Sequence, residues 1–284
     1  MSRPRRYKLS QISVSRVFSA AKVRIKDVPH TISWRFELLA HENRNRIARY
    51  HGLHTGERCF IVANGPSLTR TNLDLLSNEK TFGLNRIYLN FSKSAFRPTY
   101  YAAFNELILE QFSAEISSLN MPKFLNWNRR SCFDSRDPKV VFLKSNMVLH
   151  DFFQPDLTNP FVVGATVTFA AIQIAYYMGF QKVILVGLDH KYSESGTPNQ
   201  TEMRSTARDE SHFHPNYFPK GVRWQLPDLL RSEYDFQIAR DAFESDGREI
   251  LDATVDGQCP SFKKVEYLSL FDKETVPASN LKTA

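Results

Sequence analysis

KVILVGLD, residues 182–189, is the strongest strand signal in the chain. A short run of β-branched and aliphatic residues is typical of a strand that is buried on both faces of a parallel sheet. Residues 164–178, just before it, are apolar on all sides of a helical wheel and predict a buried helix. A buried helix that leads into a buried strand indicates an α/β fold.

The rest of the chain repeats this alternation of short apolar runs and amphipathic stretches. Further helices are predicted over 67–76, 106–118 and 233–247. The other expected strands are RCFIVA (58–63), TFGLN (81–85), TYYAAF (99–104), KFLNW (123–127), VVFL (140–143) and EILDA (249–253). Strands that alternate with helices favour a mostly parallel sheet covered on both faces. We therefore expect a single Rossmann-like, doubly wound α/β domain over 57–272, followed by a tail over 273–284.

Composition excludes several classes of protein. The chain has 284 residues, of which 42% are apolar and 24% charged, as in globular proteins. Its longest apolar runs, such as VILVGL, are too short to span a bilayer. Neither the P-loop pattern nor G-x-G-x-x-G occurs. Three separated cysteines without a C-x-x-C pair indicate neither a zinc finger nor a disulfide scaffold.

The positive charge is concentrated at the N-terminus. Residues 1–50 carry twelve Lys/Arg and three Asp/Glu, a net +9, so the remaining residues sum to −2. We predict a basic helical N-terminal extension over 1–56, with a helix over 33–50. Such an end can contact phospholipid headgroups at the inner membrane face, or it can be a solubilising tail of a cytoplasmic protein. A nucleic-acid partner is not expected, because the basic residues lie outside the α/β body.

Ligands of open α/β sheets bind beyond the carboxyl ends of the strands. Asn64-Gly65-Pro66-Ser67 follows the first strand: Gly65 and Pro66 form the turn, and Ser67 can cap a helix that favours an anion. The alternative is an ordinary strand-to-helix turn. Asn85 and Arg86 follow the second strand and could meet a base or ribose and a phosphate, or simply bond within their own loop.

A third group follows the 182–189 strand. Asp189 and His190 stand side by side at its end, with Tyr192 just beyond, and are candidates for orienting or moving a proton, although a lone His is often structural. The long loop over 191–226 then carries His212 and His214 in DESHFHPNYF. Long loops are often binding loops or lids. We expect one of these two histidines to be a general base and no metal site, since no third ligand is evident by spacing.

Five segments together resemble the 6-hydroxymethylpterin diphosphokinase-like family, the former domain of unknown function 115. They are RCFIVANGPSL, TFGLNRIYL, RPTYYAAF, YYMGFQKVILVGLDHKY and DESHFHPNYF, spread over roughly residues 55–255. That family is distantly similar to the bacterial sialyltransferases of glycosyltransferase family 42. The second resemblance implies that Asn64, Gly65, Ser67 and Asn85 hold a cytidine nucleotide. To the same nucleotide site we assign Pro66, Arg86 and Gly164.

The resemblance also implies catalytic roles. His212 or His214 would take the proton of the acceptor hydroxyl, and Tyr192 would assist the departing phosphate. The family's Arg that meets the sugar carboxylate has no counterpart in 159–163.

The expected function is a glycosyltransferase that uses a nucleotide-activated, CMP-linked sugar in surface glycan biosynthesis. Its partners would be the nucleotide-sugar donor and a glycan or lipid-linked glycan acceptor, no cofactor is required, and a homo-oligomer is left open. One alternative is an ATP-dependent diphosphokinase of the pterin type, which would need Mg²⁺ on Asp189 with Asp209 or Glu210. The other alternative is a non-catalytic, nucleotide-sensing scaffold.

Overall fold

The computed structural model describes residues 14–146, 151–194, 196–205 and 208–271, with side chains from residue 24 onward. The predicted tail over 273–284 and the start of the basic extension lie outside these residues. The helices are α1 (Val14–Phe36), α2 (Leu38–Ala48), α3 (Glu106–Gln111), α4 (Ser113–Ser117), α5 (Val167–Tyr177) and α6 (Leu229–Ser245). The strands are β1 (Arg58–Val62), β2 (Lys80–Leu84), β3 (Tyr100–Ala103), β4 (Lys123–Asn126), β5 (Val140–Leu143), β6 (Lys182–Val186), β7 (Thr201–Met203), β8 (Arg223–Gln225), β9 (Glu249–Asp252) and β10 (Lys263–Lys264).

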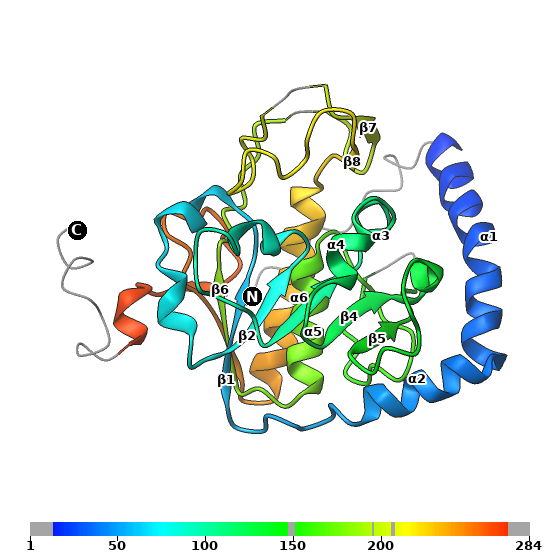
Figure 1. Ribbon diagram of the computed structural model, residues 1–284, viewed down its shortest axis with the longest axis horizontal. Helices are drawn as coiled ribbons and strands as arrows, with labels where there is room; N and C mark the ends of the chain where they lie inside the picture. Colours follow the sequence, from blue (N-terminus) through cyan, green and yellow to red (C-terminus); the bar gives the residue numbers. More distant parts are fainter. Residues whose placement is uncertain (1–13, 147–150, 195, 206–207, 272–284) are drawn as a thin grey trace.

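Eight strands form one parallel sheet in the order β10-β9-β6-β1-β2-β3-β4-β5. The chain runs outward from β1 to β5 and then returns to place β6 on the other side of β1, so the strand order reverses there. β7 and β8 form a separate antiparallel pair. The predicted doubly wound, parallel α/β sheet is thus confirmed, with α1 along one side of it and the β7–β8 pair above it (Figure 1).

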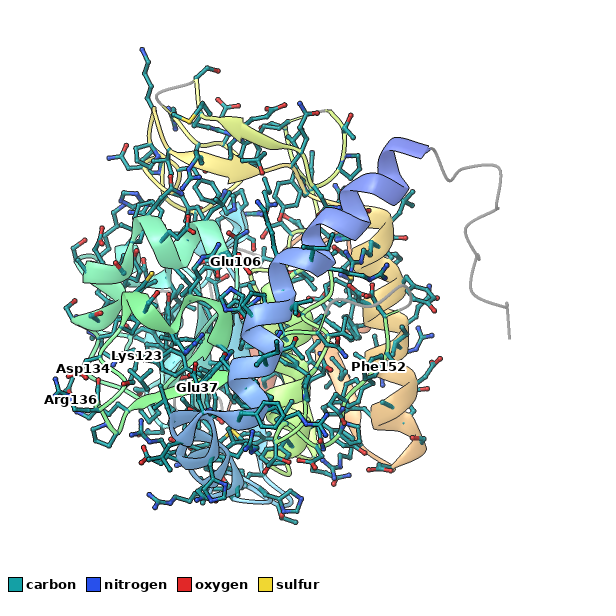
Figure 2. All side chains as sticks on the ribbon, turned by 90° about the vertical axis from the view of Figure 1, so that its right-hand side faces the viewer. Glu37, Glu106, Lys123, Asp134, Arg136 and Phe152 are labelled. Atoms are coloured by element: carbon teal, nitrogen blue, oxygen red, sulfur yellow. The ribbon has the colours of Figure 1, made fainter. Side chains whose placement is uncertain are left out.

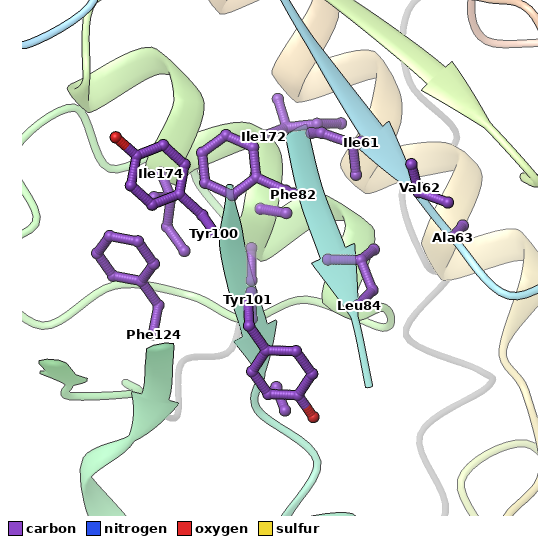
Figure 3. Close-up of a cluster of buried hydrophobic side chains, with 14 of the residues drawn as sticks. Ile61, Val62, Ala63, Phe82, Leu84, Tyr100, Tyr101, Phe124, Ile172 and Ile174 are labelled. Carbon is purple, nitrogen blue, oxygen red and sulfur yellow. The ribbon is translucent and has the colours of Figure 1, made fainter. Parts of the chain in front are cut away.

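The central strands are buried on both faces. The last four residues of β1 and of β6 are all buried, which explains their continuous apolar sequences. On one face, Phe82 and Tyr100 lie against α5, and their ring centroids are 5.1 Å apart. Figure 3 shows these rings beside Ile172 and Ile174 of α5, with Tyr101 pointing the other way. α5 is enclosed as predicted, because the sheet covers one side of it and α6 another.

Three predicted helices differ from the structure. The stretch 67–76 forms two short 3₁₀ turns, Pro66–Arg70 and Leu73–Leu76, because Asn72 stands extended between them and caps the second. The helix over 106–118 is broken at Phe112 into α3 and α4. The helix over 33–50 is two helices separated at Glu37, and the first begins at Val14.

Both N-terminal helices pack against the α/β body. On α2, the Asn43 side chain hydrogen-bonds both the N–H and the carbonyl of Phe142 at the free edge of β5. On α1, Trp34 is buried and its ring stands edge-on to Trp127 at 5.1 Å. These contacts fix α1 beside the carboxyl ends of β4 and β5. Within the described part of the chain, no helix combines the length and apolar character that a membrane span requires.

Candidate functional site

A cavity of about 880 Å³ lies at the carboxyl ends of the parallel strands. Residues at or just after the ends of six strands line it: Ala63–Gly65, Leu84 and Asn85, Phe104 and Asn105, Asn126, Ser145, and Gly187–Tyr192. The β7–β8 segment covers it with Thr201 and 224–226, and α1 contributes Lys26, Asp27 and His30. The cavity therefore occupies the position at which α/β sheets bind ligands.

Some residues of the turn after β1 line the cavity, and others hold the turn in place. Asn64 lines the cavity; its amide donates to the Leu84 carbonyl at 3.0 Å, while its Oδ1 is buried without a hydrogen-bond partner. Ser67 points elsewhere, since its N–H and hydroxyl donate to Asp189 at 2.9 and 2.6 Å. Neither Ser67 nor Pro66 is among the lining residues.

The glycine of this turn is required by packing. A Cβ on Gly65 would stand 1.8 Å from Asp189 Oδ2 and 2.7 Å from the Gly187 carbonyl oxygen. Burial raises the pKa of Asp189, and the two hydrogen bonds from Ser67 partly oppose that rise. Asp189 lines the cavity, but its carboxylate is engaged in holding the β1 turn against the end of β6.

Of the two residues that follow β2, Asn85 lines the cavity and Arg86 does not. Asn85 lines the cavity with a left-handed backbone (φ 46°) and a buried Oδ1 that lacks a partner. A strained non-glycine residue at a cavity wall is a common feature of functional sites. Arg86 is buried outside the lining: its guanidinium donates to the carbonyls of Asn216 and Tyr217 and lies 3.7 Å above the Phe112 ring centroid. The predicted phosphate ligand is thus an anchor for the long loop.

The two histidines of the long loop differ in environment. His212 lines the cavity, and its Nδ1 lies 3.0 Å from both carboxylate oxygens of Asp209. Its ring stacks on Tyr217 at 3.9 Å, and the Tyr192 ring, also at the cavity, lies 6.1 Å away. His214 is not among the lining residues and accepts a hydrogen bond from the Asn216 N–H.

The Asp209–His212 pair is arranged as a base and its orienting carboxylate. Burial tends to raise the pKa of Asp209, but the hydrogen bond and charge of His212, with Arg204, outweigh it and leave the pKa lowered. An ionised carboxylate on Nδ1 fixes the tautomer that leaves Nε2 free to accept a proton. For His214, burial and then the charges of Lys93 and Arg86 lower the pKa.

A second imidazole–carboxylate pair borders the cavity. His190 lines it with a left-handed backbone (φ 56°), and its Nε2 lies 3.1 Å from Glu233 Oε1 on α6. Gly164 lines the cavity near this pair, with φ 70° and only 2.4 Å between an added Cβ and Asp235 Oδ2. Glycine is needed there because the backbone is left-handed and because Asp235 leaves no room for a side chain. Asp235 is held in this position by a hydrogen bond from the adjacent Ala165 N–H at 2.7 Å.

The half of the cavity beneath α1 was not predicted from the sequence. Asp27 on α1 pairs with Lys144 at 2.9 Å and accepts from Asn128 Nδ2 at 2.9 Å. Asn128 also approaches Glu106 at 3.3 Å, while its Oδ1 is buried without a partner. Figure 2 shows Glu106 beside α1. Asn128 follows β4, so the strand-end rule could have selected it; the α1 residues give no such signal, because they lie about a hundred positions away.

The loop over 191–226 is fastened to the body at several points. The Phe213 N–H donates to the Asn64 carbonyl at 2.9 Å, and Asn105 donates to Gln225 at 3.3 Å. Among the residues that the structure describes, no three His, Cys, Asp or Glu side chains are grouped so as to hold a metal ion. The described polar side chains of the cavity are amides, imidazoles, carboxylates and hydroxyls, with the basic groups of Lys26, Arg129 and Lys191.

Comparison with known proteins places the chain in a family. No curated protein sequence matches it. Among solved structures, it is similar to the Maf glycosyltransferase from Magnetospirillum magneticum, with 14% identity, a TM-score of 0.48, and coverage of 85% of this chain and 41% of that one. The chain thus spans about two fifths of that protein. A family model matches residues 37–195, more than half of the chain, and the chain belongs to the 6-hydroxymethylpterin diphosphokinase MptE-like family.

Proposed function

We propose that this protein is a glycosyltransferase that moves a sugar from a CMP-linked donor to a hydroxyl of a glycan or lipid-linked glycan. The observation that carries the proposal is the Asp209–His212 pair, whose imidazole borders a cavity that Asn64 and Asn85 also line, each with a buried amide oxygen that has no hydrogen-bond partner. A base and a nucleotide-sized polar pocket at one sheet edge suit group transfer from a nucleotide.

The nucleotide is assigned to the ends of β1 and β2. Buried polar atoms without partners are costly, and a ligand that donates hydrogen bonds would remove this cost when the Asn64 and Asn85 amides turn toward the cavity. The exocyclic amine of cytosine and the ribose hydroxyls are donors of this kind. Gly164 borders the same cavity from the start of the α5 segment.

The transfer step uses His212 as general base. The acceptor oxygen attacks the anomeric carbon, the bond from that carbon to the phosphate oxygen breaks, and the hydroxyl proton passes to His212 Nε2. Asp209 stabilises the imidazolium through Nδ1–H. To Tyr192, which is 37% exposed at the cavity, and to His190 we assign hydrogen bonds to the departing phosphate.

The acceptor is assigned to the half of the cavity beneath α1. From β6 to β5 the lining crosses five strand-to-strand steps of ~4.8 Å, about 24 Å in all, which leaves room for two ligands side by side. Asn128 Oδ1, Lys26 and Ser145 offer acceptor and donor groups to a polyhydroxyl compound there.

The family description favours a second candidate, an ATP-dependent diphosphokinase. That reaction depends on Mg²⁺ held by carboxylates. Asp189, the natural ligand, has both oxygens bonded to Ser67, and Asp209 is bonded to His212. These side chains do not fit a magnesium site as they stand, so the diphosphokinase ranks second.

A thermal-shift panel of CMP, UDP, GDP and ATP, with and without Mg²⁺, tests the proposal. At about 100 times its Kd a ligand adds about 2.7 kcal/mol of stability, which corresponds to roughly 5–10 °C for a domain of this size. We expect CMP to give that shift and Asn85→Ala to abolish it. Protection by none of the nucleotides would contradict the proposal, and Mg²⁺-dependent release of AMP from ATP would establish the diphosphokinase instead.

A further inference from the structure

The outer face of α1 carries an apolar stripe that nothing in the described part of the chain covers. Ile25, Val28, Ile32 and Phe36 are 71%, 51%, 54% and 75% exposed. Their spacing of three and four residues places them on one side of the helix. Trp34, on the opposite side, is 5% exposed and packed against the body.

This arrangement reverses that of an ordinary surface helix, which turns its apolar stripe inward. Ten large apolar side chains are exposed in the described chain. Five of them lie within residues 25–38: the four of the stripe and Leu38, which is 73% exposed. An exposed apolar patch of this kind indicates a surface that meets another apolar phase. α1 spans 23 residues, about 35 Å, and lies along one side of the molecule (Figure 1).

Basic side chains flank the stripe. Arg24 and Arg35 lie along one edge of it, within the segment 1–50, whose net charge is +9. A small cavity of about 160 Å³ beside the stripe is lined by Arg24, Asp27, Val28, Thr31 and Ile32. It thus combines a guanidinium with apolar side chains, and the charge of the Asp27 carboxylate in its wall is balanced by Lys144. A second copy of the chain is a poorer occupant, because each copy would bring the same positive charge to the contact.

We infer that α1 is an interfacial helix that binds the surface of an anionic membrane. Its apolar stripe would enter the boundary between headgroups and acyl chains, with the basic residues at the level of the lipid phosphates. The inner side of the same helix contributes Lys26, Asp27 and His30 to the cavity, so the membrane would lie about one helix diameter, ~10 Å, from the cavity wall. The inference does not depend on which reaction the cavity supports.

Vesicle flotation of the full chain tests this inference. Vesicles of phosphatidylcholine alone are compared with vesicles that also contain phosphatidylglycerol. We expect binding to the anionic vesicles that weakens as salt rises from ~0.1 M to ~1 M, because the screening length falls from about 10 Å to about 3 Å. Arg24→Gln with Arg35→Gln should reduce the preference for anionic over neutral vesicles.

The stripe itself is tested by the triple variant Ile25→Ser, Ile32→Ser, Phe36→Ser. Its partition coefficient should fall at least about 100-fold, since three apolar side chains no longer enter the bilayer. The matched control, Leu53→Ser, Met203→Ser, Leu230→Ser, changes residues that are 51%, 60% and 74% exposed elsewhere and should bind like the parent. Circular dichroism checks that both variants are folded.

Three outcomes would overturn the inference: no binding of the parent chain to anionic vesicles, equal binding by the two triple variants, or a dimer in light scattering that the stripe variant abolishes. The last would assign the stripe to contact between copies. Because flotation needs no nucleotide, a failure here is distinct from a failure of the CMP proposal.

Discussion

The two halves of the cavity are built in different ways. Strand ends and the loop that follows β6 form one half, where Asn64, Asn85 and His212 face the cavity and their neighbours Ser67 and Arg86 hold the backbone in place. The other half is closed by α1, whose Asp27 is bonded to Lys144 and Asn128. The difference teaches that local motifs can identify a strand-end site, whereas a wall supplied by a distant helix leaves no local mark.

The largest expected effect separates the two histidines of the first half. His212→Ala should lower the rate of sugar transfer by about 10²–10⁴-fold, the usual contribution of a general base. His214→Ala should leave the rate unchanged, because His214 lies outside the cavity lining. Single-turnover transfer measured by chromatography gives the two rates. Equal losses in both variants would show that His212 is not the base in preference to His214.

The second half should depend on the buried ion pair. Asp27→Ala leaves the Lys144 ammonium, with a side chain 1% exposed, without its carboxylate, and we expect a loss of about 3–5 kcal/mol in the free energy of unfolding. The control is Asp134→Ala, which removes the exposed pair with Arg136 labelled in Figure 2 and should leave the free energy of unfolding nearly unchanged. Urea denaturation measures both. Similar costs would mean that α1 is not held by this pair.

The close packing around Gly65, in the half of the cavity formed by the strand ends, predicts a smaller effect. Gly65→Ala would press a methyl group against Asp189 and the Gly187 carbonyl, at a cost of about 1–3 kcal/mol in stability. The same substitution should cost less in an Asp189→Ala background, because the closest atoms are then absent. A double-mutant cycle by urea denaturation tests this coupling, and strict additivity would argue against it.

A dependence of stability on pH is expected at the start of α5. Burial, followed by the negative charge of Asp151, raises the pKa of Asp235 from 3.8 to about 8. The folded protein therefore holds a proton that the unfolded chain releases. The stabilisation of the folded state by this retained proton is complete below about pH 4 and is lost as the pH rises through about 8.

Asp235→Asn should flatten this dependence, because an amide stays neutral throughout. Parent and variant should be similar in stability near pH 5, and the variant should become relatively more stable above about pH 8. Thermal melting across this range provides the measurement. Parallel profiles would show that Asp235 does not titrate as described.

Much of the fold was predictable from the sequence. The strands β1–β6 and β9 coincide with short apolar runs, because both faces of the parallel sheet are covered and the burial is continuous along each strand. The two 3₁₀ turns after β1 were not predicted, because the local pattern of Leu68, Leu73 and Leu76 resembles that of a helix. The first of them is held by hydrogen bonds from Ser67 to Asp189, more than a hundred residues away, and the second by the Asn72 cap.

The candidate site was predictable only where strand ends form it. Asn64, Gly65, Asn85, Gly164, Asp189, His190, Tyr192 and His212 are among the cavity-lining residues, whereas Pro66, Ser67, Arg86 and His214 are not. A guanidinium after a strand indicates a phosphate site equally well whether it faces the cavity or, like Arg86, binds backbone carbonyls. Only the tertiary fold separates these cases, and their functional roles remain predictions.

A crystal structure of the protein soaked with CMP would show where the nucleotide binds. We predict density for the nucleotide in the first half of the cavity, with its polar groups at the side-chain oxygens of Asn64 and Asn85 and its phosphate near Tyr192. CMP bound beneath α1 beside Asn128, or a cavity that stays without nucleotide at saturating CMP, would contradict the account.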